Sequence, residues 1–102
     1  MNIINATWGY HGHFIDVTDI LLRAIDVDGD LTIAVTTKTL SDPCKGWIKE
    51  LNVIYSHQTN NYHIMVQEQH PQTNGGRVLY IKSGIPSTNT KFSGLMTIKV
   101  LV

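Results

Sequence analysis

The stretch Ser41–Tyr55, SDPCKGWIKELNVIY, joins a turn to a β-strand. In its second half, Leu51, Val53 and Tyr55 recur at every second position. Side chains at this spacing lie on one face of an extended strand, where they can be buried together. We therefore predict a strand over residues 48–55 whose buried face carries these three residues.

The first half of the stretch has the composition of a turn. Asp42 can accept hydrogen bonds from backbone amides two residues on, Pro43 fixes its φ, and Gly46 supplies a positive φ. Cys44 and one of the five histidines could form a nucleophile–base pair, but no recognisable oxyanion loop or orienting carboxylate accompanies them. We interpret residues 42–46 as the turn that sets the register of the strand, with Cys44 as a packing residue.

Five further segments have the composition or the alternation that is typical of strands. In one of them, Leu31, Ile33 and Val35 fall on a single face. Polar turn residues at Gln58–Asn61 predict a hairpin between two strands, and Gln72–Gly76 predicts a second hairpin. The five segments are residues 3–8, 31–36, 62–68, 77–81 and 95–102.

One segment follows a helical spacing instead. Leu21 and Ile25 recur at i and i+4, Thr18 stands where an N-cap is expected, and Asp16 precedes it. This pattern predicts one or two helical turns at about residues 18–25, capped by Asp16 and Thr18.

Short strands at regular spacing, joined by polar and glycine-bearing turns, are typical of antiparallel sandwiches and small barrels. We predict an all-β fold: a small antiparallel β-sandwich, or flattened barrel, with one short helix. With 102 residues the chain can bury one modest core, so we expect a single domain over residues 1–102. Residues 82–93, KSGIPSTNTKFS, are the most loop-like part of the chain.

Composition excludes several functional classes. Eight basic residues balance eight acidic ones, so no net charge attracts nucleic acid or an anionic membrane. The sequence has neither the roughly 18 consecutive apolar residues of a membrane span nor a signal peptide. One cysteine excludes an internal disulfide and favours a reducing compartment. We therefore expect a cytoplasmic or otherwise intracellular protein, without a cofactor.

Two groups of residues resemble metal sites but do not complete one. Asp26–Asp30 begins like a calcium loop, but Leu31 and Thr37 stand where such a loop needs glycine and glutamate. His11 and His13 would share one face of an extended segment, yet no spacing brings a third ligand near them. We predict an Asp-Gly turn, a polar loop and no metal site.

An aromatic side chain and several polar loop residues are the remaining candidates for binding. Trp47 follows a turn that contains proline and glycine, where a side chain often stays exposed. Together with His11, His13, Asn60 and Asn61, it could form a sugar-binding surface on the loops of a sandwich. The acidic residues show no pattern of a glycosidase, and we predict no catalytic residue.

A series of short segments occurs in a fixed order along the chain: Ile4–Gly9, Asp16–Leu21, Asp28–Ile33, Asp42–Tyr55 and His63–Glu68. The series resembles the uncharacterised C-terminal domain of the DnaJ homologue of subfamily C, member eleven. The His-Pro-Asp signature of a J-domain is absent, so co-chaperone activity is not implied. The resemblance implies a compact, β-rich interaction domain with no established catalytic residue.

These observations favour a non-enzymatic protein-interaction or assembly module that binds a protein partner or a second copy of itself. The alternative is a small soluble lectin-like domain that binds a glycan. A thiol-dependent hydrolase built on Cys44 is a third class, for which we expect no turnover. The apolar run 95–102 must pair inside the fold or with a neighbouring subunit.

Overall fold

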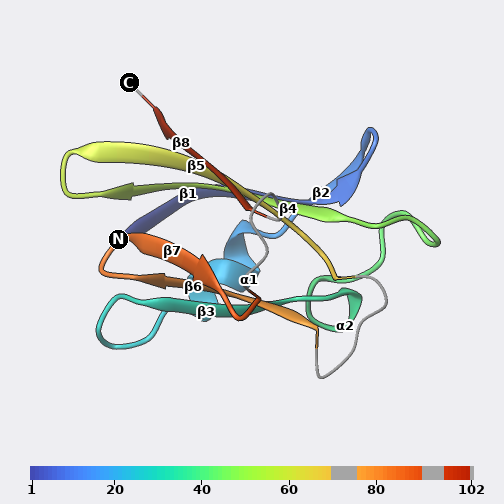
Figure 1. Cartoon of the computed structure of the whole chain (residues 1–102), viewed down its shortest axis with the longest axis horizontal. Coiled ribbons are helices and arrows are strands. Elements are labelled where there is room, and N and C mark those ends of the chain that lie inside the picture. The colour runs from blue at the N-terminus through green and yellow to red at the C-terminus, as the bar shows by residue number, and fades with distance from the viewer. Residues whose placement is uncertain (70–75, 91–95, 102) are drawn as a thin grey trace.

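The computed structural model describes residues 1–69, 76–90 and 96–101, which form two antiparallel sheets stacked in two layers (Figure 1). The strand order is β2-β1-β4-β5-β8 in the first sheet and β3-β6-β7 in the second. The predicted all-β fold is confirmed. The strands are β1 (Asn2–Tyr10), β2 (His13–Asp16), β3 (Leu31–Val35), β4 (Glu50–His57), β5 (Asn60–Gln67), β6 (Arg77–Lys82), β7 (Ile85–Thr88) and β8 (Met96–Leu101).

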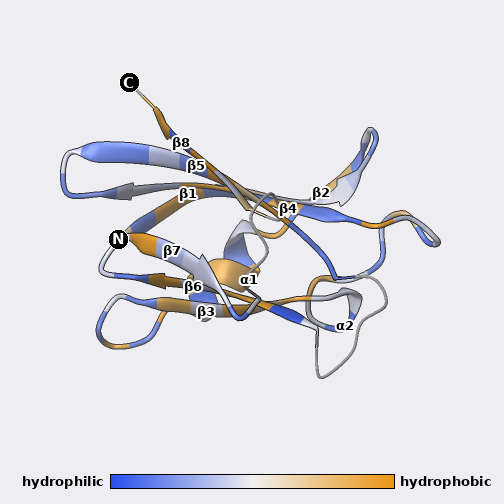
Figure 2. Ribbon diagram, viewed as in Figure 1, coloured by the Kyte–Doolittle hydropathy of each residue, from blue (hydrophilic) through white to orange (hydrophobic). Residues whose placement is uncertain are grey.

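Hydrophobic residues occur along the strands of both sheets (Figure 2), and those on the inner faces form the core. Leu51, Val53 and Tyr55 of β4 are fully buried, as their alternation predicts. Ile64 and Val66 of β5 pair with Val53 and Leu51 and are equally buried. Each such side chain contributes about 1.5–3 kcal/mol by leaving water. The second sheet supplies Leu31, Ile33, Val35, Leu79 and Ile81.

One of the two predicted hairpins forms. Strands β4 and β5 are joined by Gln58 and Thr59, and the positive φ of 57° at Gln58 suits a tight two-residue turn. The second prediction is wrong, because β5 lies in the five-stranded sheet and β6 in the three-stranded one. The link between them therefore crosses from one sheet to the other, and its residues 70–75 lie outside the described part of the chain.

Two short strands and one helical turn were not expected from the sequence. His11 and Gly12, with φ of 54° and 85°, form the turn that folds β2 back onto β1. Strand β7 lies within residues 82–93, which the sequence suggested were loop, and residues 91–93 are outside the described ranges. A second helix, α2 (Thr37–Leu40), follows β3 and begins where the Thr36 side chain accepts the N–H of Thr39 at 3.3 Å.

The predicted helix is present as α1 (Thr18–Arg23), which packs against β1. Its capping differs from the prediction. Thr18 lies inside the helix, and its hydroxyl accepts the N–H of Ala6 in β1 at 2.9 Å. Asp16 holds the helix start, because its carboxylate accepts the N–H of Thr18 at 2.8 Å. Hydrogen bonds from the Thr18 side chain and backbone lower the pKa of Asp16.

Asp26–Asp30 forms the Asp-Gly turn that the sequence predicts. The Asp26 carboxylate accepts the backbone N–H groups of Asp28 at 2.9 Å and of Asp30 at 3.0 Å, and Gly29 has a φ of 80°. The side-chain oxygen is thus used by the turn itself. Among the described residues, no helix is long and apolar enough to cross a membrane.

Candidate functional site

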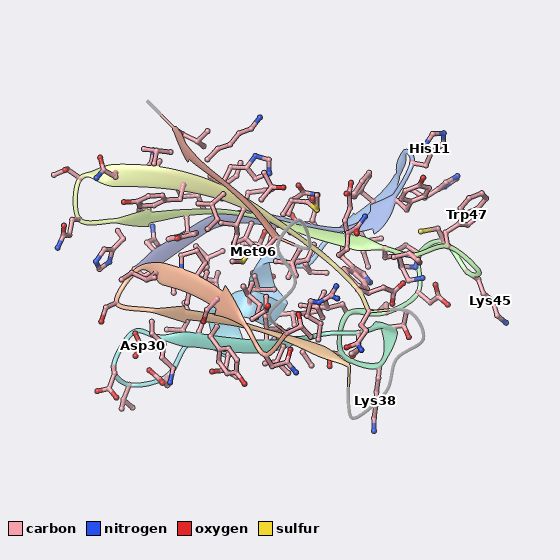
Figure 3. All side chains as sticks on the ribbon, in the orientation of Figure 1. His11, Asp30, Lys38, Lys45, Trp47 and Met96 are labelled. Atoms are coloured by element: carbon pink, nitrogen blue, oxygen red, sulfur yellow. The ribbon has the colours of Figure 1, made fainter. Side chains whose placement is uncertain are left out.

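The turn before β4 presents Trp47 to solvent. The N–H of Trp47 donates to the carbonyl of Cys44 at 3.2 Å, which closes a four-residue turn. Gly46 stands third in that turn with a φ of 88°, as its sequence position predicts. Cys44 is buried with a free thiol, in agreement with a packing role. The turn thus places Lys45 and Trp47 at its outer end (Figure 3).

A buried lysine holds this turn against the sheet. The Lys49 side chain is 3% exposed, and its ammonium lies 3.0 Å from a carboxylate oxygen of Asp42 and 3.2 Å from one of Glu68. It also donates to the carbonyl of Trp47 at 2.7 Å and to that of Cys44 at 3.4 Å. The sequence predicted that Asp42 accepts backbone N–H groups, whereas the structure pairs its carboxylate with Lys49.

Strand alternation explains why these charges are buried. Lys49 lies two residues before Leu51, and Glu68 lies two residues after Val66, so both continue the inner face. The backbone N–H of Glu68 donates to the Lys49 carbonyl at 2.8 Å, and the N–H of Lys49 donates to the Glu68 carboxylate at 2.8 Å. Burial alone would lower the pKa of Lys49, but the hydrogen bonds and charges of Asp42 and Glu68 outweigh it and raise the pKa.

A second buried cation lies nearby and connects the two sheets. Arg77 begins β6, and its guanidinium donates to the Gln67 carbonyl at the end of β5 and to the Thr90 hydroxyl. Burial lowers the pKa of Arg77. These contacts fix the end of β5 against the second sheet. The end of β5 is therefore held by Arg77 at Gln67, and the next residue, Glu68, is held by Lys49.

Trp47 is exposed but oriented by its neighbours. Its ring stacks on Tyr10 with centroids 5.5 Å apart and planes 14° apart, and Tyr10 in turn stacks on His11 at 5.4 Å. Trp47 nevertheless remains 62% exposed. Figure 3 shows Trp47 and His11 at the same end of the molecule, far from Asp30.

A hollow of about 570 Å³ lies beside these rings. Tyr10, Trp47 and Ile48 form its apolar part, and the Lys49–Glu68 pair lines it as well. A ligand here would meet two aromatic rings above the buried Lys49–Glu68 pair. We call Tyr10, Trp47 and Ile48, together with this hollow, the Trp47 surface.

The structure brings three of the five predicted binding residues together. Trp47, His11 and His13 line a smaller cavity of about 140 Å³ with Tyr10 and Cys44. Asn60 and Asn61, in contrast, start β5 beyond the far end of β4, so they lie at the opposite end of the sheet (Figure 1). Within the described part of the chain, no three His, Cys, Asp or Glu side chains are placed to hold a metal ion.

No family model matches the chain, and comparisons with curated proteins and with solved structures gave no significant match. The resemblance to the DnaJ-homologue domain therefore stays a prediction. Three positions of its segments nevertheless meet in one cluster, in which the buried Lys49 contacts both Asp42, from the same segment, and the buried Glu68, from the next one. The sequence pattern alone gave these residues no joint role, although the alternation places Lys49 and Glu68 on the inner face.

Proposed function

We propose that this chain is a non-enzymatic protein-interaction or assembly module that binds a segment of a partner protein on the Trp47 surface. The observation that supports this most is the large exposed ring of Trp47 beside a hollow. Tryptophan and tyrosine are the residues most often found as energetic anchors of protein interfaces.

Preorganisation strengthens the proposal. The backbone of Trp47 is held by Cys44 and Lys49, and its ring is held by Tyr10. A side chain that is already ordered loses little conformational entropy on binding, so more of the contact energy appears as affinity. The partner that fits is an extended segment with an apolar side chain that packs on Trp47 and enters the hollow.

The charged groups of the hollow favour binding over catalysis. Lys49 is engaged by Asp42 and Glu68, which leaves its amine hydrogen-bonded and protonated rather than nucleophilic. The free thiol of Cys44 is buried and suits a chain that works in a reducing, intracellular compartment.

Selection from a random peptide library on the immobilised protein tests this proposal. We expect bound peptides to share an apolar anchor residue, and we expect Trp47→Ala to weaken their binding at least about tenfold. Val27→Ala is the control, because Val27 is a fully exposed apolar residue in the turn that leads to Asp30, and Figure 3 shows Asp30 at the other end of the molecule from Trp47. Peptides that bind Trp47→Ala as tightly as the native protein would refute the proposal.

A glycan is the second candidate ligand, because exposed aromatic rings also stack on sugars and Gln67 and Thr37 line the same hollow. A site made of all five residues predicted from the sequence is not assembled, since Asn60 and Asn61 lie elsewhere. A glycan array probed with native protein and Trp47→Ala distinguishes the two. Binding of a sugar that depends on Trp47, with no peptide selected, would favour the lectin.

A further inference from the structure

The four edge strands of the two sheets differ in how they are protected. Unprotected edges present free N–H and C=O groups that can pair with another chain. Strand β2 has only four residues, and β7 contains Pro86, which has no N–H. Strand β3 is bridged by Ile25 at Leu31 and contacted by α2. The six-residue β8 has neither a proline nor, among the described residues, a strand along its outer edge.

Strand β8 also carries apolar side chains that the second sheet leaves uncovered. Ile98 pairs with the buried Ile64 and Val100 with Tyr62, so both point to the inner face. Even so, Ile98 is 47% exposed and Val100 is 60% exposed. Met96 at the start of β8 still packs against the core, whereas Ile98 and Val100 continue the inner face beyond it as an apolar strip.

Of the two symmetric registers that pair five residues of β8 with five, one is self-complementary. Two identical antiparallel edge strands are related by a twofold axis perpendicular to the sheet, which passes through a single residue position. With the axis at Ile98, Ile98 faces Ile98, Met96 faces Val100, and Thr97 faces Lys99. With the axis at Lys99, two ammonium groups face each other, which is unfavourable.

We propose that two copies of this chain pair through β8 in the register centred on Ile98, so that two five-stranded sheets become one continuous sheet. The apolar strip of each copy then extends that of the other. This pairing uses a different surface from Trp47 and does not depend on the proposed partner binding. The paired area is small, so the dimer should form and dissociate with protein concentration.

Sedimentation equilibrium from about 1 μM to about 1 mM protein tests the pairing. We expect the mass to rise from monomer to dimer, and we expect Val100→Lys to raise the dissociation constant at least about tenfold. Ile85→Lys is the matched control, because Ile85 is an exposed isoleucine on β7, an edge strand that Pro86 protects. Trp47→Ala should dimerise normally, which separates this inference from the partner-binding proposal.

Cysteine cross-linking in a Cys44→Ala background tests the register, after circular dichroism has shown that each variant is folded. Ile98→Cys should oxidise rapidly to a covalent dimer, because directly facing positions satisfy disulfide geometry. Lys99→Cys should react slowly, since its symmetry mate lies diagonally, about 7–8 Å away. A native protein that stays monomeric at about 1 mM, a dimer that survives Val100→Lys, or faster cross-linking at Lys99→Cys would overturn the proposal.

Discussion

The ammonium of Lys49 lies 3.0 Å from the carboxylate of Asp42, and this contact joins the turn before β4 to the buried end of the sheet. Glu68 contacts the same ammonium from β5 at 3.2 Å. Because Trp47 lies between Asp42 and Lys49 in the chain, the position of the exposed ring depends on a buried ion cluster. The stability of the fold and the position of the Trp47 ring are therefore coupled at this end of the molecule.

Removing the lysine should be costly. Lys49→Ala removes the ammonium that contacts the buried carboxylate of Glu68, and it removes the same contact from Asp42. We expect a loss of about 3 kcal/mol in the free energy of unfolding, measured by denaturant titration. Lys45→Ala, an exposed lysine in the same turn, should change stability by less than about 0.5 kcal/mol.

The double variant Lys49→Met/Glu68→Gln checks the cause of that loss. If an uncompensated charge is responsible, the double variant should be less destabilised than the sum of the two single variants. Equal losses in Lys49→Ala and Lys45→Ala would show that the cluster contributes nothing.

Tyr55 should make stability depend on alkaline pH. Burial, followed by the charge of Tyr62, raises the pKa of Tyr55 to about 12 from an ordinary value of 10.0. The folded state therefore resists ionisation that the unfolded state undergoes. The contribution of Tyr55 to the free energy of unfolding is fully present below pH 10.0. It falls by about 2 kcal/mol as the pH rises towards 12.

Tyr55→Phe isolates this effect from other groups that titrate in the same range. The variant loses the hydrogen bond from the Tyr55 hydroxyl to the Gly84 carbonyl at 2.8 Å, which costs about 1 kcal/mol near neutral pH. The difference in unfolding free energy between native protein and variant should then shrink as the pH rises above 10.0 and reverse in sign as the pH approaches 12. A difference that stays constant across this range would contradict the prediction.

The parts of this fold that were predictable from sequence are those set by local alternation. Leu31, Ile33 and Val35, like the apolar face of β4, are buried because side chains in a strand alternate between faces. Strands β2 and β7 have four residues each, too few for the alternation to stand out from a loop. Whether β5 pairs with β8 or with β6 depends on contacts between residues far apart in the sequence. Turn residues carry only local information, so the second hairpin predicted from them is wrong.

The candidate site was predictable only in part for a related reason. The sequence predicts an exposed Trp47 because the residue follows a turn, which is local information. Its stacking on Tyr10 depends on the pairing of β1 with β4, which spacing does not reveal. Alternation does place Lys49 and Glu68 on the inner face. Because charged residues are seldom fully buried, a charged residue at such a position is easily interpreted as the exposed end of the strand.

Gly9 should tolerate no side chain. A Cβ atom there would lie 1.9 Å from the backbone oxygen of His13, because the backbone of β2 lies very close to Gly9. Gly9→Ala must therefore push β2 away from β1, and we expect a loss of about 3 kcal/mol in thermal or denaturant unfolding. Gly12→Ala meets no atom within 4 Å but has a φ of 85°, so it should cost only about 1 kcal/mol. Equal losses in the two variants would argue against the close contact.

Tyr10 should control the order of the Trp47 ring more than the stability of the fold. Tyr10→Ala removes the stacked partner, so Trp47 should become more accessible to acrylamide, measured by fluorescence quenching. Trp8 is fully buried and should contribute little to that signal. The free energy of unfolding should fall by only about 1 kcal/mol.

Phe14→Ala is the control for this measurement. Phe14 faces Gly9 across the hairpin, whereas Tyr10 faces His13, so the two aromatic side chains project from opposite faces of the same pair of strands. We expect quenching of Trp47 to be unchanged in Phe14→Ala and clearly increased in Tyr10→Ala. Preorganised rings lose less conformational entropy when they bind a ligand. Tyr10→Ala should therefore also weaken the binding of any peptide selected on the Trp47 surface. Unchanged quenching in Tyr10→Ala would show that the turn alone, through Cys44 and Lys49, orients Trp47.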